Sequence, residues 1–454
     1  MTQSHTRDQT MDLHPPAAVR EIAERLERAG FETWAVGGAV RDAVLALPAG
    51  DWDLATRARP QEVRRLFRRT APIGIEHGTV GVLGRDGVLY EVTTFRRDVE
   101  TFGRHAVVAF ADTIEEDLAR RDFTFNALAW RPSTGELRDP FGGLDDLHAG
   151  RLRTVGRAAE RFAEDYLRVL RALRFAGHFR LAIAPETWRP LVEATAHLPQ
   201  LSAERIREEL WKILSNTPHA SAPLSLYAAS GVLAVLYPEL DRSVGAAVAN
   251  GRGDAWALSL RAVDALPRTR PLLRVAALLH ALGSDHSAPR APAAGTAPEV
   301  QRAERAAGIM RRLKASNQET ERVARLVAFH TAFPTEQLPA AATDADVRRW
   351  LRDVGTDLVP DLVRLRFAFD RAGAGPGTAV LAAWARRVRR VLGTRPPLEL
   401  SDLAIGGEDL KRLGLAPGPR MGEVLRTLLD RVVSDPSLNT RERLLALARQ
   451  ELER

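Results

Sequence analysis

The chain has 454 residues, with 65 lysines and arginines against 58 acidic residues, a formal net charge of +7 and no cysteine. This length is too great for one compact core and predicts two to four domains. The lack of cysteine excludes disulfides, thiolate metal sites and cysteine nucleophiles. No apolar run is long enough to cross a membrane, so we expect no membrane partner and a cytoplasmic protein.

The basic residues are almost all arginine, because only Lys212, Lys314 and Lys411 are lysine. Guanidinium groups bind phosphate through two hydrogen bonds and stack on bases, which suits a nucleic-acid partner. Net charge by itself does not identify that partner, since many enzymes are moderately basic.

Residues 1–18 are polar and lack the apolar core of a signal peptide, so they predict a disordered tail. A small α/β or α+β domain follows over residues 19–150. Its predicted helices and strands, in chain order, are a helix at 18–29, a strand at 33–36, a helix at 39–47, a strand at 51–55, a helix at 61–69, and strands at 78–83 and 88–95.

Beyond residue 157 the pattern becomes helical, and we find no convincing strand there. The first predicted helices cover residues 158–176, 186–197, 203–214 and 222–231. Two weak linkers interrupt the later helices, at 283–298 and 372–377. We divide this part of the chain into a helical neck over 151–240 and a helical body and tail over 241–454.

Two aspartates in the predicted head are the most informative feature. Asp51 and Asp53 lie two apart on a predicted strand, so both carboxylates project from one face. Clustered carboxylates attract Mg²⁺, which commonly takes only one or two protein ligands and leaves room for substrate phosphates. Upstream, Gly37 and Gly38 open a predicted helix whose amides favour phosphate. The alternative is a solvated turn or a helix cap.

Two further segments are rich in paired charges. The run from Glu115 to Leu128 contains Arg120, Arg121 and Asp122, which could form a surface cluster of ion pairs. In the second segment, Asp165, Arg168, Arg171 and Arg174 follow one another at helical spacing. Three arginines on one helix face repel one another, which favours a negatively charged ligand; the alternative is a solvated face with a weak ion pair.

Order and spacing of these motifs over residues 33–214 resemble the bacterial tRNA nucleotidyltransferase and poly(A) polymerase family. The motifs are Gly37-Gly38-x-Val40-Arg41-Asp42, Asp51-x-Asp53, Arg120-Arg121-Asp122-Phe123-Thr124-x-Asn126-Ala127, Asp139-Pro140-x-Gly142-Gly143-x-x-Asp146, Glu164-Asp165-x-x-Arg168-x-x-Arg171-x-x-Arg174-Phe175, and Arg205-Ile206 with Glu208-Glu209-Leu210. The resemblance implies a polymerase-beta-like α+β head with a mixed sheet, followed by a mostly α-helical C-terminal half.

The resemblance also implies residue roles. Asp51 and Asp53 would hold Mg²⁺ for two-metal phosphoryl transfer, and Gly38, Arg41 and Arg121 would contact the triphosphate. Glu91 is a candidate third metal carboxylate, although a strand-face glutamate paired with an arginine is an equal alternative.

In the family, the helix from Asp165 to Arg174 reads the incoming base. Asp165 and Arg168 would form an amino-acid template, and Arg171 and Arg174 would complete the nucleotide site. A carboxylate accepts a hydrogen bond from the exocyclic amine of cytosine or adenine, whereas uracil and guanine present an oxygen there. The implied partners are therefore CTP, ATP and the tRNA 3′ end.

The expected activity is addition or repair of the 3′-terminal CCA of tRNA. The motifs are shared by enzymes that add only A, only CC, or poly(A), so these stay open, as does a non-catalytic RNA-binding protein. A metal phosphohydrolase is a further alternative, because the segment Leu278 to Gly283 resembles a His-Asp metal motif. Here Ala281 stands at the aspartate position beside His280, so we expect a helical remnant without metal.

Overall fold

The structure is a computed structural model that describes residues 9–102, 105–248, 253–282, 298–330 and 343–453. It divides into two compact units. Unit 1 comprises residues 1–213 and 222–238, and unit 2 comprises residues 214–221 and 239–454. The predicted domain limits at residues 150 and 240 stay predictions.

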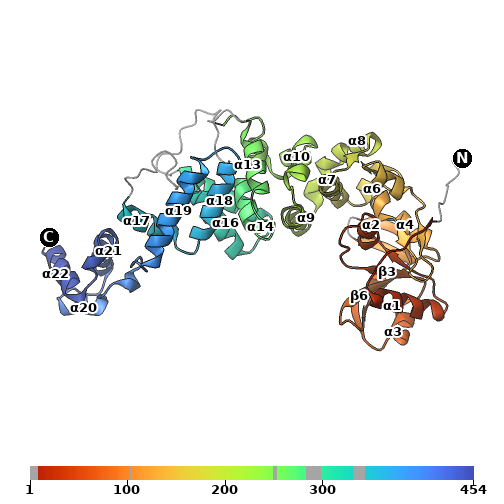
Figure 1. Ribbon diagram of the computed structural model, residues 1–454, viewed down its shortest axis with the longest axis horizontal. Helices are drawn as coiled ribbons and strands as arrows, with labels where there is room; N and C mark the ends of the chain where they lie inside the picture. Colours follow the sequence, from red (N-terminus) through yellow and green to blue (C-terminus); the bar gives the residue numbers. More distant parts are fainter. Residues whose placement is uncertain (1–8, 103–104, 249–252, 283–297, 331–342, 454) are drawn as a thin grey trace. The chain divides into compact units, whose positions relative to one another are not determined.

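An eight-stranded sheet forms the centre of the first part of unit 1 (Figure 1). The elements of this part are β1 (Gln9–Thr10), α1 (Ala17–Arg28), β2 (Thr33–Val36), α2 (Gly38–Val44), β3 (Asp53–Thr56), α3 (Pro60–Leu66), β4 (Thr70–Gly74), β5 (Thr79–Leu83), β6 (Leu89–Thr94), β7 (Arg96–Phe102), β8 (His105–Phe110), α4 (Ile114–Ala119), a 3₁₀ turn at Thr124–Asn126, β9 (Ala129–Trp130), β10 (Glu136–Arg138), α5 (Gly143–His148) and β11 (Arg151–Leu152).

The strand order is β1-β10-β9-β2-β3-β6-β5-β4. Strands β3 and β6 run parallel, with Leu54 beside Val92, and the other neighbours are antiparallel. The predicted mixed sheet is thus present. Strands β7 and β8 form a separate hairpin.

The two faces of this sheet are covered differently. On one face Leu54, Val82 and Val92 are buried, and α1 and α3 contact this face. On the other face Trp34, Val36 and Ala55 pack against Ile114 and Leu118 of α4. Further along this second face, on β4 to β6, Ile73, Leu89 and Glu91 are exposed. Helices α1 and α3 therefore contact one face from β2 to β5, whereas α4 covers only part of the other face.

Several predicted boundaries need correction. Residues 9–18 do not all belong to a disordered tail, because β1 pairs with β10, α1 begins at Ala17, and Leu13 is buried. Strand β3 begins at Asp53, so Asp51 lies just outside it. Helix α3 ends at Leu66, before the end of the helix predicted at 61–69, and strand β4, which contains Pro72 and a register shift, was not predicted.

Helices form the rest of unit 1, apart from the short strand β12 (Ala182–Ile183), which pairs with β11 and had no recognisable pattern. The helices are α6 (Ala158–Glu164), α7 (Leu167–Phe179), α8 (Pro185–Ala194), α9 (Ala203–Asn216), α10 (Ser221–Ala229), α11 (Val232–Leu236) and α12 (Pro238–Asp241), with α9, α10 and α12 continuing into segments of unit 2. The single helix predicted at 158–176 is wrong, since Asp165 has extended backbone angles (φ −155°, ψ 105°) and separates α6 from α7.

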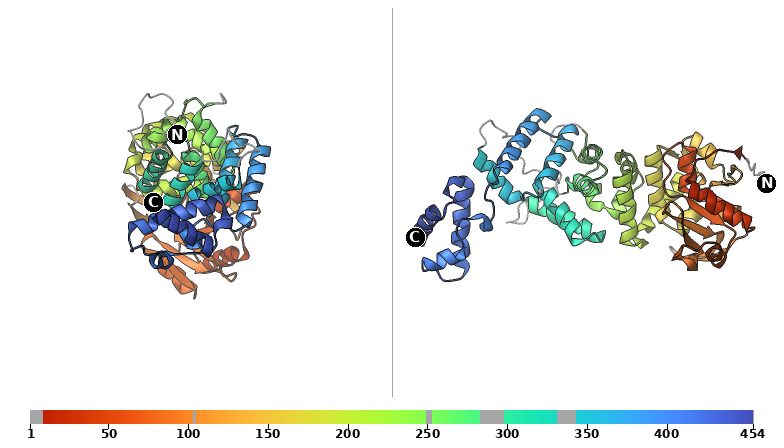
Figure 2. Two further views of the ribbon diagram at one scale, coloured as in Figure 1. Left: turned by 90° about the vertical axis from the view of Figure 1, so that its left-hand side faces the viewer. Right: turned by 60° about the horizontal axis from the view of Figure 1, so that its bottom comes forward.

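Unit 2 is built from helices. These are α13 (Ala255–Asp264), α14 (Pro271–Leu279), α15 (Pro298–Arg312), α16 (Asn317–Phe329), α17 (Asp344–Val354), α18 (Val359–Arg371), α19 (Thr378–Gly393), α20 (Gly407–Arg412), α21 (Pro419–Ser434) and α22 (Arg441–Leu452). The last three share a small apolar core around Leu410, Leu428 and Leu444 (Figure 2). The predicted linker at 372–377 joins α18 to α19, whereas the one at 283–298 lies, apart from Pro298, outside the described residues. No described helix is long and apolar enough to cross a membrane.

Candidate active site

The carboxylates of Asp53 and Glu91 lie on the same face of two neighbouring strands. Asp53 opens β3 and Glu91 lies on β6 one position before Val92, the partner of Leu54, so the two strands place them roughly 5 Å apart in the pairing direction. Burial raises the pKa of Asp53 to about 6; the negative charges of Glu91 and Asp51 add to this rise, whereas Arg121 opposes it. This acidic group is therefore short of positive charge.

A divalent cation would relieve that repulsion, and carboxylate oxygens are the donors that Mg²⁺ prefers. Among the described residues, no group of three or more histidine, cysteine, aspartate or glutamate side chains comes close enough to hold a metal ion. The arrangement thus fits a cation that takes one or two carboxylates from the protein and the rest of its ligands from substrate and water. No ion pair between Glu91 and an arginine is found within the described residues, and its role as a third ligand stays a prediction.

A pocket of about 390 Å³ adjoins Asp53. It brings together side chains from α2, the segment after α4, and α7, which are far apart in the sequence. Its lining residues are Gly37, Gly38, Arg41, Asp53, Arg121, Asp122, Asn126, Arg171 and Phe175. Five predicted site residues therefore share one pocket: Gly38, Arg41, Asp53, Arg121 and Arg171.

Gly37 and Arg121 meet at one wall of this pocket. Gly37 has a positive φ of 77°, a conformation that favours glycine. A Cβ atom there would lie 2.9 Å from Nη1 of Arg121, so the guanidinium would have to move. Nη2 of Arg121 donates to Asp117 across 3.3 Å. Its Nε is buried without a hydrogen-bond partner among the described residues. An anion in the pocket would satisfy that donor.

A chain of hydrogen bonds joins α2 to α7 behind the pocket. Nη1 of Arg41 donates to Asn126 across 2.6 Å, Nδ2 of Asn126 donates to Asp122 across 3.0 Å, and Nε of Arg171 donates to Asp122 across 2.7 Å. Arg41 also pairs with Asp42, so at most two of its five N–H donors remain for a ligand. The network fixes the position of two arginines before any ligand binds.

Asp122 and Arg171 form a partly buried ion pair in this network. Burial alone would raise the pKa of Asp122, but Arg171 and the hydrogen bond from Asn126 hold that pKa below its ordinary value. Burial likewise opposes the charge of Arg171, and Asp122 with Glu209 nevertheless raises its pKa. Both groups are charged. Removing Asp122 would take the carboxylate partner from Arg171, and removing Arg171 would leave the Asp122 carboxylate without its ion pair, with hydrogen bonds from Asn126 and the N–H of Phe123 remaining. Asp122, Asn126 and Phe175 were not predicted as site residues, although they stand in the motifs that contain Arg121 and Arg174.

The predicted base-reading residues have partners that the sequence spacing did not indicate. Asp165 does not pair with Arg168. Arg205 of α9 donates to both of its carboxylate oxygens, across 3.1 and 2.7 Å. Arg168 donates to Glu164 across 2.5 Å, and Arg174 donates to the fully buried Glu209 across 2.7 Å.

The expectation of a repulsive arginine helix is therefore wrong. Arg168, Arg171 and Arg174 each have an acidic partner from another segment or turn of the chain, so repulsion among them does not by itself demand a ligand. Asp165 and Arg168 still flank the break between α6 and α7, where a carboxylate and a guanidinium are less than one helical turn apart in sequence. Arg205 and Glu209 belong to the last motif of the sequence analysis.

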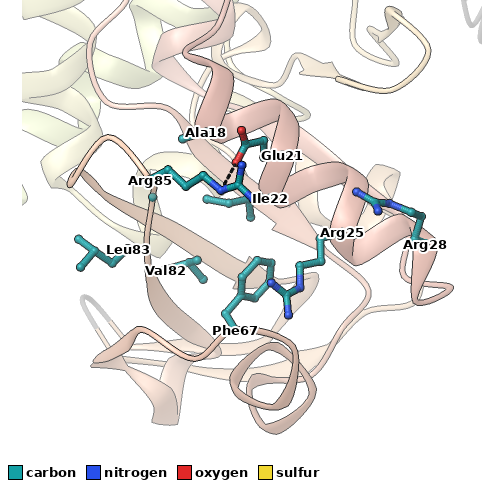
Figure 3. A pocket seen from close by; sticks show the side chains of 10 residues that line it. Ala18, Glu21, Ile22, Arg25, Arg28, Phe67, Val82, Leu83 and Arg85 are labelled. Atoms are coloured by element: carbon teal, nitrogen blue, oxygen red, sulfur yellow. Dashed lines mark ion pairs between the residues drawn. The ribbon is translucent and has the colours of Figure 1, made fainter.

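A larger pocket of about 490 Å³ lies on the face of the sheet that α1 covers (Figure 3). Arg85 pairs with Glu21 across 3.3 Å, and the guanidinium of Arg25 lies 5.0 Å from the ring centre of Phe67. Glu21 is the only acidic residue among those lining it. This pocket lacks a second carboxylate, so size alone does not identify the catalytic pocket.

In unit 2, the predicted remnant at His280 lies in a buried cluster. Nδ1 of His280 is 2.9 Å from the carbonyl oxygen of Ala277 and 3.2 Å from Oγ of Ser259. The ring of His330 lies 5.6 Å away, and both rings contact Phe369. Burial lowers the pKa of His280 to about 4 and of His330 to about 3. The described part of this cluster contains no acidic ligand.

Known proteins with similar sequences and structures connect these observations. Residues 33–153 match the model for the poly A polymerase head domain, and residues 180–243 match the model described as "Probable RNA and SrmB-binding site of polymerase A". Residues 390–448 match the model for tRNA nucleotidyltransferase domain 2. The matched regions include the sheet from β2 to β10, the pocket residues up to Asn126, and the small helical core at the end of unit 2, whereas Arg171 and Phe175 lie outside them.

Whole-length relatives agree with these models. The chain is 33% identical over 437 residues to a CCA-adding enzyme of Geobacillus stearothermophilus, covering 94% of each chain. It is 35% identical over 431 residues to one from Limosilactobacillus fermentum, covering 94% of this chain and 95% of the relative. A crystal structure of the Bacillus stearothermophilus CCA-adding enzyme in complex with CTP superposes with a TM-score of 0.72, covering 97% of this chain and 98% of that one at 30% identity.

The fold and the pocket define a nucleotidyltransferase of the poly(A) polymerase type. Similarity over almost the full length narrows this class further. The chain belongs to the family of CCA-adding enzymes.

Proposed function

We propose that this chain builds or repairs the 3′-terminal CCA of tRNA from CTP and ATP, with Mg²⁺ held by Asp51 and Asp53. One observation carries the site assignment: a single pocket joins Asp53 to the guanidinium groups of Arg41, Arg121 and Arg171. Carboxylates for a cation and arginines for a triphosphate are the two requirements of phosphoryl transfer. Solved structures of CCA-adding enzymes in complex with CTP, ATP or tRNA_CCA support the choice of substrates.

In this proposal the triphosphate lies along the glycine-lined wall of the pocket. Arg121 donates to it through its free Nε, and Arg41 donates through the N–H groups that Asp42 and Asn126 leave free. When bound, Mg²⁺ lowers the pKa of the RNA 3′-hydroxyl and neutralises charge on the leaving pyrophosphate. Because Arg41 is held by Asn126, its guanidinium is already oriented before the nucleotide arrives.

Base selection is assigned to Asp165 and Arg168, with Arg171 and Arg174 completing the nucleotide site. Arg205 holds the Asp165 carboxylate through two hydrogen bonds, while Oδ2 retains a free lone pair. That lone pair can accept from the exocyclic amine of cytosine or adenine. With uracil or guanine it would meet an oxygen, and an unpaired buried acceptor costs about 1 to 3 kcal/mol.

The experiment supplies purified protein with three RNAs: a tRNA ending before CCA, the same tRNA ending in CC, and an unrelated oligo(A). Each is incubated with each nucleotide separately, and the products are sequenced. CTP alone should add two C residues to the first RNA, ATP alone should add one A to the second, and a reaction with both nucleotides should complete CCA on the first. Extension of oligo(A) would instead indicate a poly(A) polymerase, and addition to only one tRNA would indicate an A-only or CC-only enzyme.

A further inference from the structure

An exposed apolar patch begins beside the catalytic carboxylates, on the part of the sheet that no described helix covers. It consists of Ile73 on β4, Gly81 on β5 and Leu89 on β6. Ile73 is 42% exposed and Leu89 is 43% exposed. Gly81 pairs with Glu91, and Leu89 lies two residues before Glu91 on the same strand, so the patch shares a face with Asp53 and Glu91.

Gly81 makes this surface continuous. A Cβ atom at Gly81 would lie 2.6 Å from Cδ1 of Ile73 and 3.1 Å from Cδ1 of Leu89. The two side chains therefore close over the glycine from opposite sides and leave no gap between them. All three positions are apolar. Together they form a small exposed apolar surface whose hydration is unfavourable.

We propose that the 3′-terminal bases of the acceptor RNA stack on this patch, an inference that rests on the proposed function. Strands lie about 4.8 Å apart and two residues span about 6.8 Å, which places Leu89 roughly 8 Å from Asp53. Stacked nucleotides rise about 3.4 Å each. When the terminal 3′-hydroxyl reaches Asp53, the last two or three nucleotides therefore lie at the level of the patch.

The apolar character of the patch matches what this substrate requires. During CCA synthesis the RNA end changes from an arbitrary base to C and then to CC, so its binding surface must accept different bases. Stacking on an apolar surface is tolerant of sequence because every base has a flat face. An arginine lies at the far end of the patch: Arg69 is exposed, and its carbonyl oxygen accepts from the N–H of Leu83 on β5. It could pair with an upstream phosphate.

Leu89→Asp tests this inference in the full-length protein. We expect the KM for a tRNA transcript ending before CCA to rise about tenfold or more, because stacking is lost and a negative charge faces RNA. The Kd for CTP without RNA should stay within twofold of wild type. Val88→Asp is the matched control, since Val88 is the neighbouring residue and is 51% exposed, but alternation along the chain directs it to the other face. An unchanged RNA KM in Leu89→Asp, or an equal rise in both variants, overturns the inference.

A second measurement does not depend on variants. A tRNA transcript carrying 4-thiouridine at its last position is irradiated on the wild-type protein, and crosslinked peptides are identified by mass spectrometry. Crosslinks within residues 70–92 would support stacking on the patch. Crosslinks found only outside these residues would contradict the inference. A dimer in solution that Leu89→Asp converts to monomer would assign the patch to a second copy and also contradict it. The proposed function is judged separately, because its failure would abolish C addition by the wild type.

Discussion

Two clusters of potential metal ligands, one in each unit, have opposite electrostatics. In unit 1, Asp53 carries a carboxylate whose pKa is raised partly by neighbouring negative charge, and it lines an open pocket. In unit 2, His330 is buried and His280 is half-buried. Burial is the main cause that lowers both pKa values, and the nearby charges of Arg302 and Arg366 also lower the pKa of His330. A cation is favoured at the first cluster and opposed at the second.

The two clusters differ in how their charge is balanced, and this difference separates the candidate metal site of unit 1 from the histidine cluster of unit 2. Both clusters contain metal-ligand residue types at familiar spacing. The first leaves charge uncompensated beside a pocket, whereas the second neutralises its histidines by burial and directs their Nδ1 atoms to helix carbonyl oxygens. Perturbed pKa values occur in both places, so the direction and cause of the shift decide the interpretation.

The largest expected effect is on the carboxylates of unit 1. Asp51→Ala and Asp53→Ala should each lower nucleotide incorporation by about a thousandfold or more, because metal binding and transition-state stabilisation are lost together. RNA affinity should change less than twofold, since it depends on arginines spread over the helical parts. Single-turnover incorporation and a filter-binding assay measure the two quantities. Residual activity within tenfold of wild type in both variants would contradict the metal assignment.

A smaller effect is expected at the base-reading carboxylate. Asp165→Ala should lower kcat/KM for CTP and ATP about ten- to a hundredfold, because a charge-assisted hydrogen bond worth roughly 1.5 to 3 kcal/mol is lost. UTP should fall less or rise, so the ratio of CTP to UTP use decreases. Glu160→Ala is the control, since Glu160 forms an exposed ion pair with Arg157 on the preceding helix. If Asp165 only anchors Arg205, all four nucleotides will fall by one factor.

Local sequence patterns predicted the helices and strands of the head well. Contacts between residues far apart in the sequence could not be predicted in this way. The strand at Thr33–Val36 was predicted at its observed bounds, since four apolar or β-branched residues precede a Gly-Gly turn. The partner of Asp165 was not predicted, because Arg205 is forty residues away and helical spacing shows only neighbours. The break between α6 and α7 was missed for the same reason. Asp165 has an extended backbone there, and its carboxylate accepts hydrogen bonds from Arg205 of α9. Asp122 and Asn126 were quoted in a motif, but only the fold shows that they join Arg41 to Arg171.

The histidine cluster of unit 2 predicts a dependence of stability on acid. Both histidines have folded-state pKa values below 6.5, so the unfolded chain binds protons first as the pH falls. The free energy of unfolding should therefore be unaffected by them above about pH 7 and should decrease from pH 6.5 towards pH 4. The slope is at most about 1.4 kcal/mol per pH unit for each histidine. Scanning calorimetry of wild type and of a His280→Asn, His330→Asn double variant measures this, and an equally steep decrease in both proteins would contradict it.

The smallest expected effect is on the activity of the His280 variant. His280→Ala should leave nucleotide addition within about twofold of wild type at 25 °C, because the residue packs against Phe369 and Ser259 in the other unit and touches no part of the pocket. The substitution removes buried contacts, so the variant should have a lower Tm than wild type. That decrease would show that the substitution changed the folded protein. Added Ni²⁺, Co²⁺ or Mn²⁺ should produce no phosphatase or cyclic phosphodiesterase activity in the wild type. Metal-dependent hydrolysis that disappears in His280→Ala would show that this cluster binds a catalytic metal despite its burial. The proposed difference between the clusters of the two units would then be wrong.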